Sequence, residues 1–164
     1  MEKITKLAPN QVFVFGSNLA GKHGRGAAKQ ALKWGARYGK GEGLCGQTYG
    51  IPTKDRNLNV LSLEQIAKHI NRFIKFAKQH PNLEFLVTEI GCGLAGYKPK
   101  DIAPLFRKAL KVHNIKLPDR FIEILMVCPY CDILLVQHNN GPQWYCPQCG
   151  HRNYLLYGCT DEVI

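Results

Sequence analysis

The sequence contains no apolar run that approaches the roughly 18 residues of a membrane-spanning helix. Its first ten residues, MEKITKLAPN, carry charges and lack the apolar stretch of a secretory signal peptide. The seven cysteines are an odd number, and four of them occur as two CxxC pairs, which in a reducing compartment indicate a metal site. We therefore expect a cytoplasmic protein with no membrane segment and no disulfide framework.

The glycine-rich stretch GSNLAGKHGRG, residues 16–26, lacks both standard nucleotide-binding fingerprints. It contains no GxxxxGK[ST], and Gly21, Gly24 and Gly26 run as GxxGxG, which is the reverse of the Rossmann order. We therefore do not expect a P-loop ATPase.

The charge of the chain is unevenly distributed. The 164 residues have a formal net charge of +10 at pH 7. From Cys128 onward one base, Arg152, stands against three acids, so this segment has a net charge of −2 and residues 1–127 carry +12. Such a surplus favours an anionic partner, either a phosphorylated small molecule or a nucleic acid backbone; the alternative is a solvated surface with no partner.

Apolar runs and helical patterns alternate along the first 127 residues. We expect strands at residues 12–15, 49–51, 84–90 and 120–127, and helices at 27–34, 62–77 and 101–112. This alternation predicts an α/β fold with a mostly parallel sheet between helices. Residues 1–127 form the first predicted domain and residues 128–164 a small second one. His69 and His80, in and just after the second helix, are expected at the surface.

Two of the predicted strands run into glycine-rich loops, at residues 16–26 and 91–97. Each loop precedes a helix, and the carboxyl ends of parallel strands meet at one edge of a sheet, so both loops can offer backbone N–H groups to one anion. The alternative is that the glycines only shape tight turns. Residues 53–56, TKDR, follow another strand and are further site candidates, or else an exposed polar turn.

The segments VFVFGSNLAGKHGRGAAKQAL and VTEIGCGLAGY resemble the macro domain family, in its IGCGL branch of ADP-ribose binders and hydrolases. The resemblance spans residues 3–127 and implies a three-layer α/β domain that binds ADP-ribose. It implies that residues 16–28 wrap the distal ribose and that residues 91–97 hold the pyrophosphate. The expected ligand-binding residues are Gly16, Ser17, Asn18, Gly24, Arg25, Gly26, Lys54, Gly91, Cys92, Gly93, Leu94, Ala95, Gly96 and Tyr97.

The same resemblance bears on catalysis. Asn18 stands where many members of the family have a functional asparagine, and His23 lies in the same loop, so both are candidates to position or activate water. His23 has the alternative of an exposed loop residue. The family's adenine-contacting aspartate is replaced by Lys3, its nucleophilic lysine falls near Val60, and its acid position holds Ala95. We therefore expect the lysine and acid mechanism to be absent.

A second class of function stays open. The form GSNLAGKHGRG also resembles proteins common in bacteria and phages, which suggests a non-enzymatic module that binds nucleic acid or a phage or host protein. Nucleic acid would contact the basic first domain.

The two CxxC pairs, Cys128 with Cys131 and Cys146 with Cys149, are separated by fourteen residues and closely resemble a zinc ribbon. Four thiolates complete a tetrahedral Zn²⁺ site, so the metal is expected to be structural. His151 and Cys159 are the alternative candidates if one of these four cysteines is not a ligand. The module is acidic, which disfavours phosphate binding and leaves a protein partner as our expectation. Its aromatic residues either contact a partner or fill a small core: Tyr130, Trp144, Tyr145, Tyr154 and Tyr157.

Overall fold

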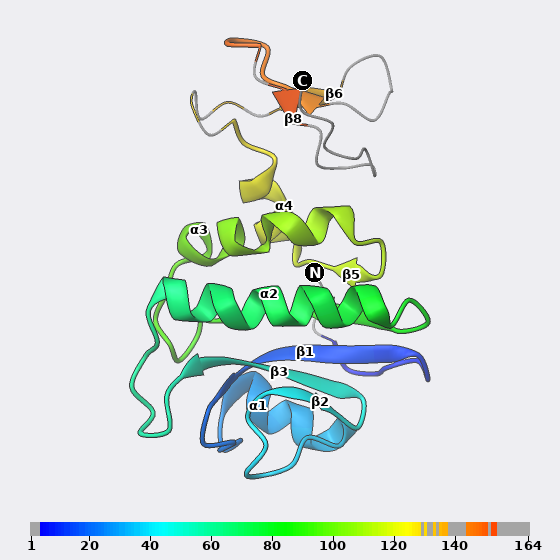
Figure 1. Ribbon diagram of the computed structural model, residues 1–164, viewed down its shortest axis with the longest axis vertical. Coiled ribbons are helices and arrows are strands. Elements are labelled where there is room, and N and C mark those ends of the chain that lie inside the picture. The colour runs from blue at the N-terminus through cyan, green and yellow to red at the C-terminus, as the bar shows by residue number, and fades with distance from the viewer. Residues whose placement is uncertain are drawn as a thin grey trace.

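The fold is organised around β1 (Gln11–Asn18), the central strand of a five-stranded sheet (Figure 1). The computed structural model describes residues 4–128, 130, 133, 135–137, 144–150 and 152–153. The sheet has the order β2-β3-β1-β4-β5, with parallel pairs except for β2 and β3, which are antiparallel. The other strands are β2 (Gly43–Cys45), β3 (Thr48–Lys54), β4 (Glu84–Val87) and β5 (Ile115–Lys116). The molecule is therefore an α/β protein with a mixed, largely parallel sheet.

Helices cover both faces of this sheet (Figure 1). Along β1, Val12 and Val14 join the larger core, whereas Phe13 and Phe15 join a smaller one on the opposite face. This division explains why the strand shows no polar alternation. One face carries α1 (Gly26–Ala31) and η1 (Leu32–Trp34), and the other carries α2 (Leu63–Gln79), α3 (Pro99–Ile102), η2 (Ala103–Lys111) and α4 (Asp119–Leu125).

Helix α2 begins at a capping box, as the sequence predicts. The Ser62 side chain accepts from the backbone N–H of Gln65, and the Gln65 side chain accepts from the backbone N–H of Ser62. The prediction that His69 lies at the surface is wrong, because this residue is 9% exposed. Its Nδ1 lies 2.7 Å from a carboxylate oxygen of Glu42, which also accepts from Arg72, so the loop before β2 is attached to α2.

The predicted strand at residues 120–127 is wrong, because these residues belong mainly to α4. Phe121 and Leu125 are buried four residues apart, which is a helical spacing, and Pro118 and Asp119 provide a favourable helix start. The edge strand next to β4 is β5 instead. In the predicted helix at 101–112, the residues of η2 bury every third side chain, which matches its 3₁₀ geometry.

A second, three-stranded antiparallel sheet follows the first 127 residues. It consists of β6 (Val136–Gln137), β7 (Trp144–Tyr145) and β8 (Arg152–Asn153). The predicted division into two domains stays a prediction. Within the described part of the chain, no helix combines the length and the apolar character needed to cross a membrane.

Candidate functional site

The first glycine-rich loop follows the carboxyl end of β1. The side chain of Asn18 forms hydrogen bonds across this loop. The side-chain oxygen of Asn18 accepts from the backbone N–H of Lys22 at 2.9 Å, and its amide nitrogen donates to the backbone oxygen of Lys22 at 2.7 Å. Asn18 is 8% exposed. Both polar ends of this side chain are therefore engaged by the loop that it helps to shape.

A second segment, residues 37–41, packs against the first loop. The Ser17 hydroxyl donates to the carbonyl of Gly41, and the N–H of Gly39 donates to the carbonyl of Gly21 at 3.0 Å. A Cβ at Gly41 would overlap the carbonyl oxygen of Asn18, so only glycine fits there. This segment fixes the shape of the first loop from behind.

His23 contacts that segment and does not line the cleft described below. The residue is fully buried, with its ring 5.5 Å from that of Phe15 and 5.7 Å from that of Tyr38. Its Nε2 faces the carbonyl oxygens of Arg37 at 3.0 Å and Lys40 at 3.2 Å, so Nε2 carries the proton and donates. We correct both interpretations of His23: it is neither placed to act on water in the cleft nor exposed.

The second glycine-rich loop turns sharply after β4. The N–H of Cys92 donates to the carbonyl of Glu89, and the N–H of Tyr97 donates to the carbonyl of Gly91. Gly91 has a φ of 77°, and a Cβ there would lie 3.0 Å from Ile102. A Cβ at Gly16 would lie 3.4 Å from the nitrogen of Gly91, so the ends of the two strands approach closely.

The two loops border one cleft of about 540 Å³. Four of the predicted site residues do not line it: His23, Cys92, Gly96 and Tyr97. Sequence reasoning did not select Lys22, Leu58 and Glu89, which do line it. The predicted ligand-binding residues that line it are Gly16, Ser17, Asn18, Gly24, Arg25, Gly26, Lys54, Gly91, Gly93, Leu94 and Ala95.

The lining of the cleft is electropositive and rich in unpaired donors. Lys22, Arg25 and Lys54 line it, with Glu89 as its one carboxylate. Glu89 lies 3.8 Å from Arg120, so its charge is partly balanced. Within the described part of the chain, no hydrogen bond engages the backbone N–H groups of five lining residues: Gly24, Arg25, Gly93, Leu94 and Ala95. Because donors and cations converge on one space, the cleft suits an anion.

Lys54 ends β3 inside the cleft, whereas Val60 does not line it and is 46% exposed. The position near Val60, where the resemblance sets the nucleophilic lysine, is thus outside the cleft. Lys3, at the position of the family's adenine-contacting acid, lies outside the described residues. Ala95 lines the cleft and offers no acid.

Two apolar side chains stand exposed at the cleft. Leu94 is 63% exposed and Leu58 is 41% exposed. Leu58 has a φ of 70°, the one positive value for a non-glycine residue in the described ranges, and this conformation is costly for leucine. Asp55 holds its loop by accepting from the N–H groups of Asn57 and Asn59. The recurring Asp and Asn in DRNLN were the available sequence signal for this turn.

Asp55 and Cys92 titrate away from their ordinary ranges. Partial desolvation raises the pKa of Asp55, but the hydrogen bonds from Asn59, Asn57 and Leu58 lower it overall. Burial raises the pKa of the Cys92 thiol to about 11, with a further contribution from the charge of Glu89. Cys92 also donates to the carbonyl of Ile90 at 3.5 Å, so it is a protonated thiol rather than a nucleophile.

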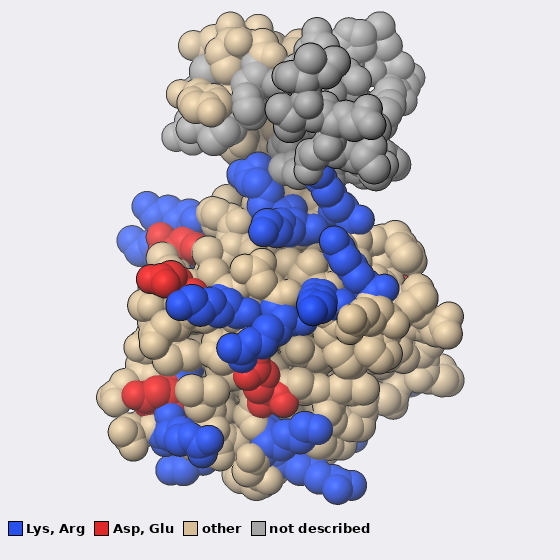
Figure 2. Space-filling view, viewed as in Figure 1, with Lys and Arg blue, Asp and Glu red and all other residues tan. Residues whose placement is uncertain are grey.

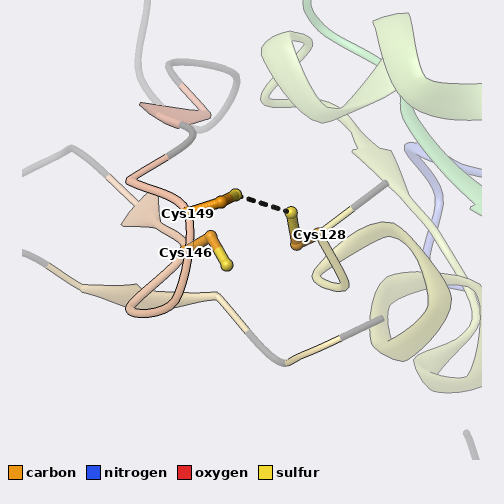
Figure 3. Close-up of side chains that lie close together, drawn as sticks. All are labelled: Cys128, Cys146 and Cys149. Atoms are coloured by element: carbon orange, nitrogen blue, oxygen red, sulfur yellow. Dashed lines mark hydrogen bonds between the residues drawn. The ribbon is translucent and has the colours of Figure 1, made fainter. Parts of the chain in front are cut away.

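Three cysteines come together beyond the first sheet (Figure 3). The sulfur atoms of Cys128, Cys146 and Cys149 lie within 4.8 Å of one another, with Cys128 and Cys149 3.7 Å apart. Tetrahedral zinc with Zn–S bonds of about 2.3 Å places its sulfurs about 3.8 Å apart. The predicted fourth ligand, Cys131, lies outside the described residues, as do His151 and Cys159. The described cysteines therefore fit a metal site.

The turn that holds Cys146 and Cys149 is also suited to thiolates. The backbone N–H of Cys149, and then that of Gln148, lower the pKa of the Cys146 thiol to about 7, against the opposing effect of desolvation. The N–H of Gly150 donates to the carbonyl of Cys146 at 2.9 Å, and Gly150 has a φ of 72°. Such a turn aims two sulfurs and several N–H groups at one point.

Comparison with protein-family models, with curated proteins and with solved structures gives no match for this chain.

Proposed function

We propose that the cleft binds ADP-ribose or a closely related phosphorylated nucleotide metabolite. The observation that carries this proposal is that two glycine-rich loops, from β1 and from β4, present unpaired backbone N–H groups to one electropositive cleft. Backbone donors of this kind suit a pyrophosphate, which has many acceptor oxygens and no donors of its own. The resemblance of both loops to the macro domain family supports the same ligand.

The cleft matches such a ligand in size and in the variety of its lining. Its volume of about 540 Å³ lies in the range of sites for nucleotide-sized molecules. Lys22, Arg25 and Lys54 supply positive charge for the phosphates. Leu58 and Leu94 supply exposed apolar contacts for the face of the base or for the carbon atoms of a ribose. These features of the lining support the proposal of ADP-ribose as the ligand.

If the protein is an enzyme, the reaction that fits this ligand is hydrolysis of a group attached to the distal ribose. Of the two predicted catalytic residues, only Asn18 lines the cleft. Because both ends of its side chain bond to the backbone of Lys22, we assign it the role of holding the first loop in shape. Asn18→Ala tests this assignment, because a chemical role predicts a larger loss of turnover than of affinity, whereas a shaping role predicts that affinity falls as well.

Isothermal titration calorimetry of the full chain tests the ligand. We expect ADP-ribose to bind with one site per chain, and ribose 5-phosphate, which lacks the pyrophosphate and the base, to bind at least about tenfold more weakly, a difference of about 1.4 kcal/mol. Absence of ADP-ribose binding, or equal affinity for both compounds, would contradict the proposal.

We further propose that the metal at the cysteine cluster is Zn²⁺ and that Cys131 completes its four ligands. Four thiolates leave no position for water or substrate, so the zinc would stabilise the fold and take no part in chemistry. Reduced, metal-bound thiolates fit a cytoplasmic protein. Metal analysis of the purified protein should give one zinc per chain. A stoichiometry near zero after purification without chelators would contradict this proposal.

The protein partner expected at this module stays a proposal as well. Three apolar side chains of this segment are exposed: Tyr130 at 76%, Ile133 at 37% and Val136 at 38%. These side chains offer an apolar surface for a protein partner.

A further inference from the structure

The exposed face formed by α2 and η2, which we call the basic face, carries a large excess of positive charge (Figure 2). Helix α2 contains four Lys or Arg residues and one acid, Glu64. The neighbouring η2 contains three Lys or Arg residues and no acid. None of these residues lines the cleft. The basic residues of this face are Lys68, Arg72, Lys75, Lys78, Arg107, Lys108 and Lys111.

The periodicity of each element places these cations on the outer surface. Helix α2 buries Ile66, Ile70, Phe73 and Ala77 against the sheet, so the positions between them, spaced by three and four residues, face solvent. The 3₁₀ element η2 buries every third residue, which leaves Lys108 exposed on its outer edge. Figures 1 and 2, drawn from the same side, show the cations gathered over α2 and the layer next to it.

Two of these cations have acidic partners, whereas others make no ion pair among the described residues. Lys68 lies 3.2 Å from Glu64, and Arg72 lies 2.9 Å from Glu42. Lys75, Lys78 and Lys108 make no ion pair within the described part of the chain. Glu84 lies 4.0 Å from Lys116, and Glu89 lies 3.8 Å from Arg120. Lys75, Lys78 and Lys108 therefore give the basic face a positive charge that no ion pair within the described ranges balances.

We propose that the basic face binds the phosphate backbone of a nucleic acid duplex without reading its base sequence. The large apolar side chains that stand exposed in the described ranges are Tyr38, Leu58, Val60, Leu94, Tyr130, Ile133 and Val136, and none lies on α2 or η2. Stacking on unpaired bases needs exposed aromatic residues, and insertion into a membrane surface needs exposed apolar ones. A duplex backbone needs only an array of cations.

The dimensions of α2 suit this partner. Its 17 residues give a rod about 25 Å long, which spans about seven base pairs at 3.4 Å each. Cations spaced along such a rod can contact several phosphates at once. Because phosphate contacts release counterions, about four contacts predict a slope near −3.6 for log K against log salt concentration.

Fluorescence anisotropy of the full chain with a labelled duplex of about 20 base pairs tests this inference between about 50 and 200 mM salt. We expect the double variant Lys75→Gln with Lys108→Gln to bind more weakly and to reduce the salt slope by about two. The matched control is Lys29→Gln with Lys33→Gln, which removes the same charge from α1 and η1 on the opposite face of the sheet. The control should keep the parental slope.

Several results would overturn the inference. These are no duplex binding at about 50 mM salt, an equal loss of affinity in both double variants, or tighter binding to single strands of the same length. A fourth is stronger binding to vesicles containing phosphatidylserine than to the duplex, with the same dependence on Lys75 and Lys108, because the partner would then be a membrane surface. Calorimetry of the Lys75→Gln, Lys108→Gln variant with ADP-ribose should give the parental affinity, which separates this site from the cleft.

Discussion

The α/β part of the molecule and the cysteine cluster differ in the size of their described apolar cores. The larger core of the α/β part contains 22 buried apolar residues, among them Phe73, Phe85 and Phe121. The described cluster around the cysteines contains three buried residues, Cys128, Leu135 and Cys146, with Trp144 packed against them. Because the described core of the second region is so small, we expect the proposed zinc to supply much of its stability.

From this difference we infer that the proposed metal and the proposed ligand belong to separable parts of the protein. The cleft is built from strand ends and loops that rest on the larger cores, and none of the three clustered cysteines lines it. The described cysteine cluster brings three sulfur atoms close together, an arrangement that suits the proposed Zn²⁺. Substitutions in one region should therefore leave the other nearly intact.

The largest expected effect is loss of the metal in Cys146→Ser. Structural zinc contributes about 10–16 kcal/mol to the folding of small modules, so loss of a ligand should release zinc and unfold the region around Trp144. Metal analysis and a shift in tryptophan fluorescence measure this. ADP-ribose affinity should stay within about threefold, or about 0.6 kcal/mol. The matched control Cys45→Ser, in β2, should keep the zinc.

One outcome of that experiment would contradict the separation of the cleft from the cysteine cluster. If Cys146→Ser abolishes ADP-ribose binding that the parent protein has, the cysteine module contributes to the cleft and the two regions are not separable.

The converse perturbation is Phe85→Ala in β4. Phe85 is fully buried, and its ring lies 5.5 Å from that of Phe73 and 6.0 Å from that of Phe76. Removal of this side chain should lower the free energy of unfolding by about 3–5 kcal/mol. Urea denaturation measures this loss. Zinc content below the urea transition should equal that of the parent, and loss of zinc in the folded variant would show that the two regions fold as one unit.

Within the cleft, Gly93→Val should block the ligand while preserving the fold. A Cβ at Gly93 meets no atom within 4 Å, and the residue lines the cleft, so valine adds bulk without internal clashes. We expect ADP-ribose affinity to fall at least about tenfold, or 1.4 kcal/mol, with an unchanged unfolding midpoint. Gly24→Val tests the first loop in the same way, because its Cβ position is also open. Parental affinity in both variants would refute the cleft as the site.

The smallest expected effect concerns Leu58. Asparagine tolerates a positive φ better than leucine does, so Leu58→Asn should leave stability within about 0.5 kcal/mol of the parent. It removes an exposed apolar contact, and ADP-ribose affinity should fall about threefold to tenfold. The control Val60→Asn changes a similarly exposed residue that does not line the cleft, and should not alter affinity. Equal effects in both variants would show that Leu58 has no contact with the ligand.

The sequence predicted the structure best where the hydrophobic pattern and the order of strands and helices point to the same arrangement. The run VFVF predicts a strand buried on both faces, and β1 sends alternate side chains into two cores. Parallel connections predict that the loops after β1 and β4 share an edge of the sheet, and they border one cleft. In the run RFIEILMV, by contrast, apolar residues at every spacing satisfy both helix and strand patterns. The helix start at Pro118 and Asp119, together with the burial of Phe121 and Leu125, decides in favour of α4.

The directions in which side chains point could not be predicted from the sequence. His23 and Asn18 occupy the same loop, but one faces residues 37–41 and the other borders the cleft. That difference depends on a segment about fifteen residues away in the chain. The positive φ of Leu58 likewise follows from the hydrogen bonds around Asp55 and not from any preference of leucine.

Titration of isotopically labelled protein with ADP-ribose, followed by the backbone amide signals, tests most directly whether both glycine-rich loops bind one ligand. We expect the amides of Gly24 and Arg25 in one loop to shift together with those of Gly93, Leu94 and Ala95 in the other, with one common dissociation constant. We also expect unchanged signals for α2 and for Cys146 and Cys149. Shifts confined to a single loop, or centred outside the cleft, would contradict binding of one ligand by both loops.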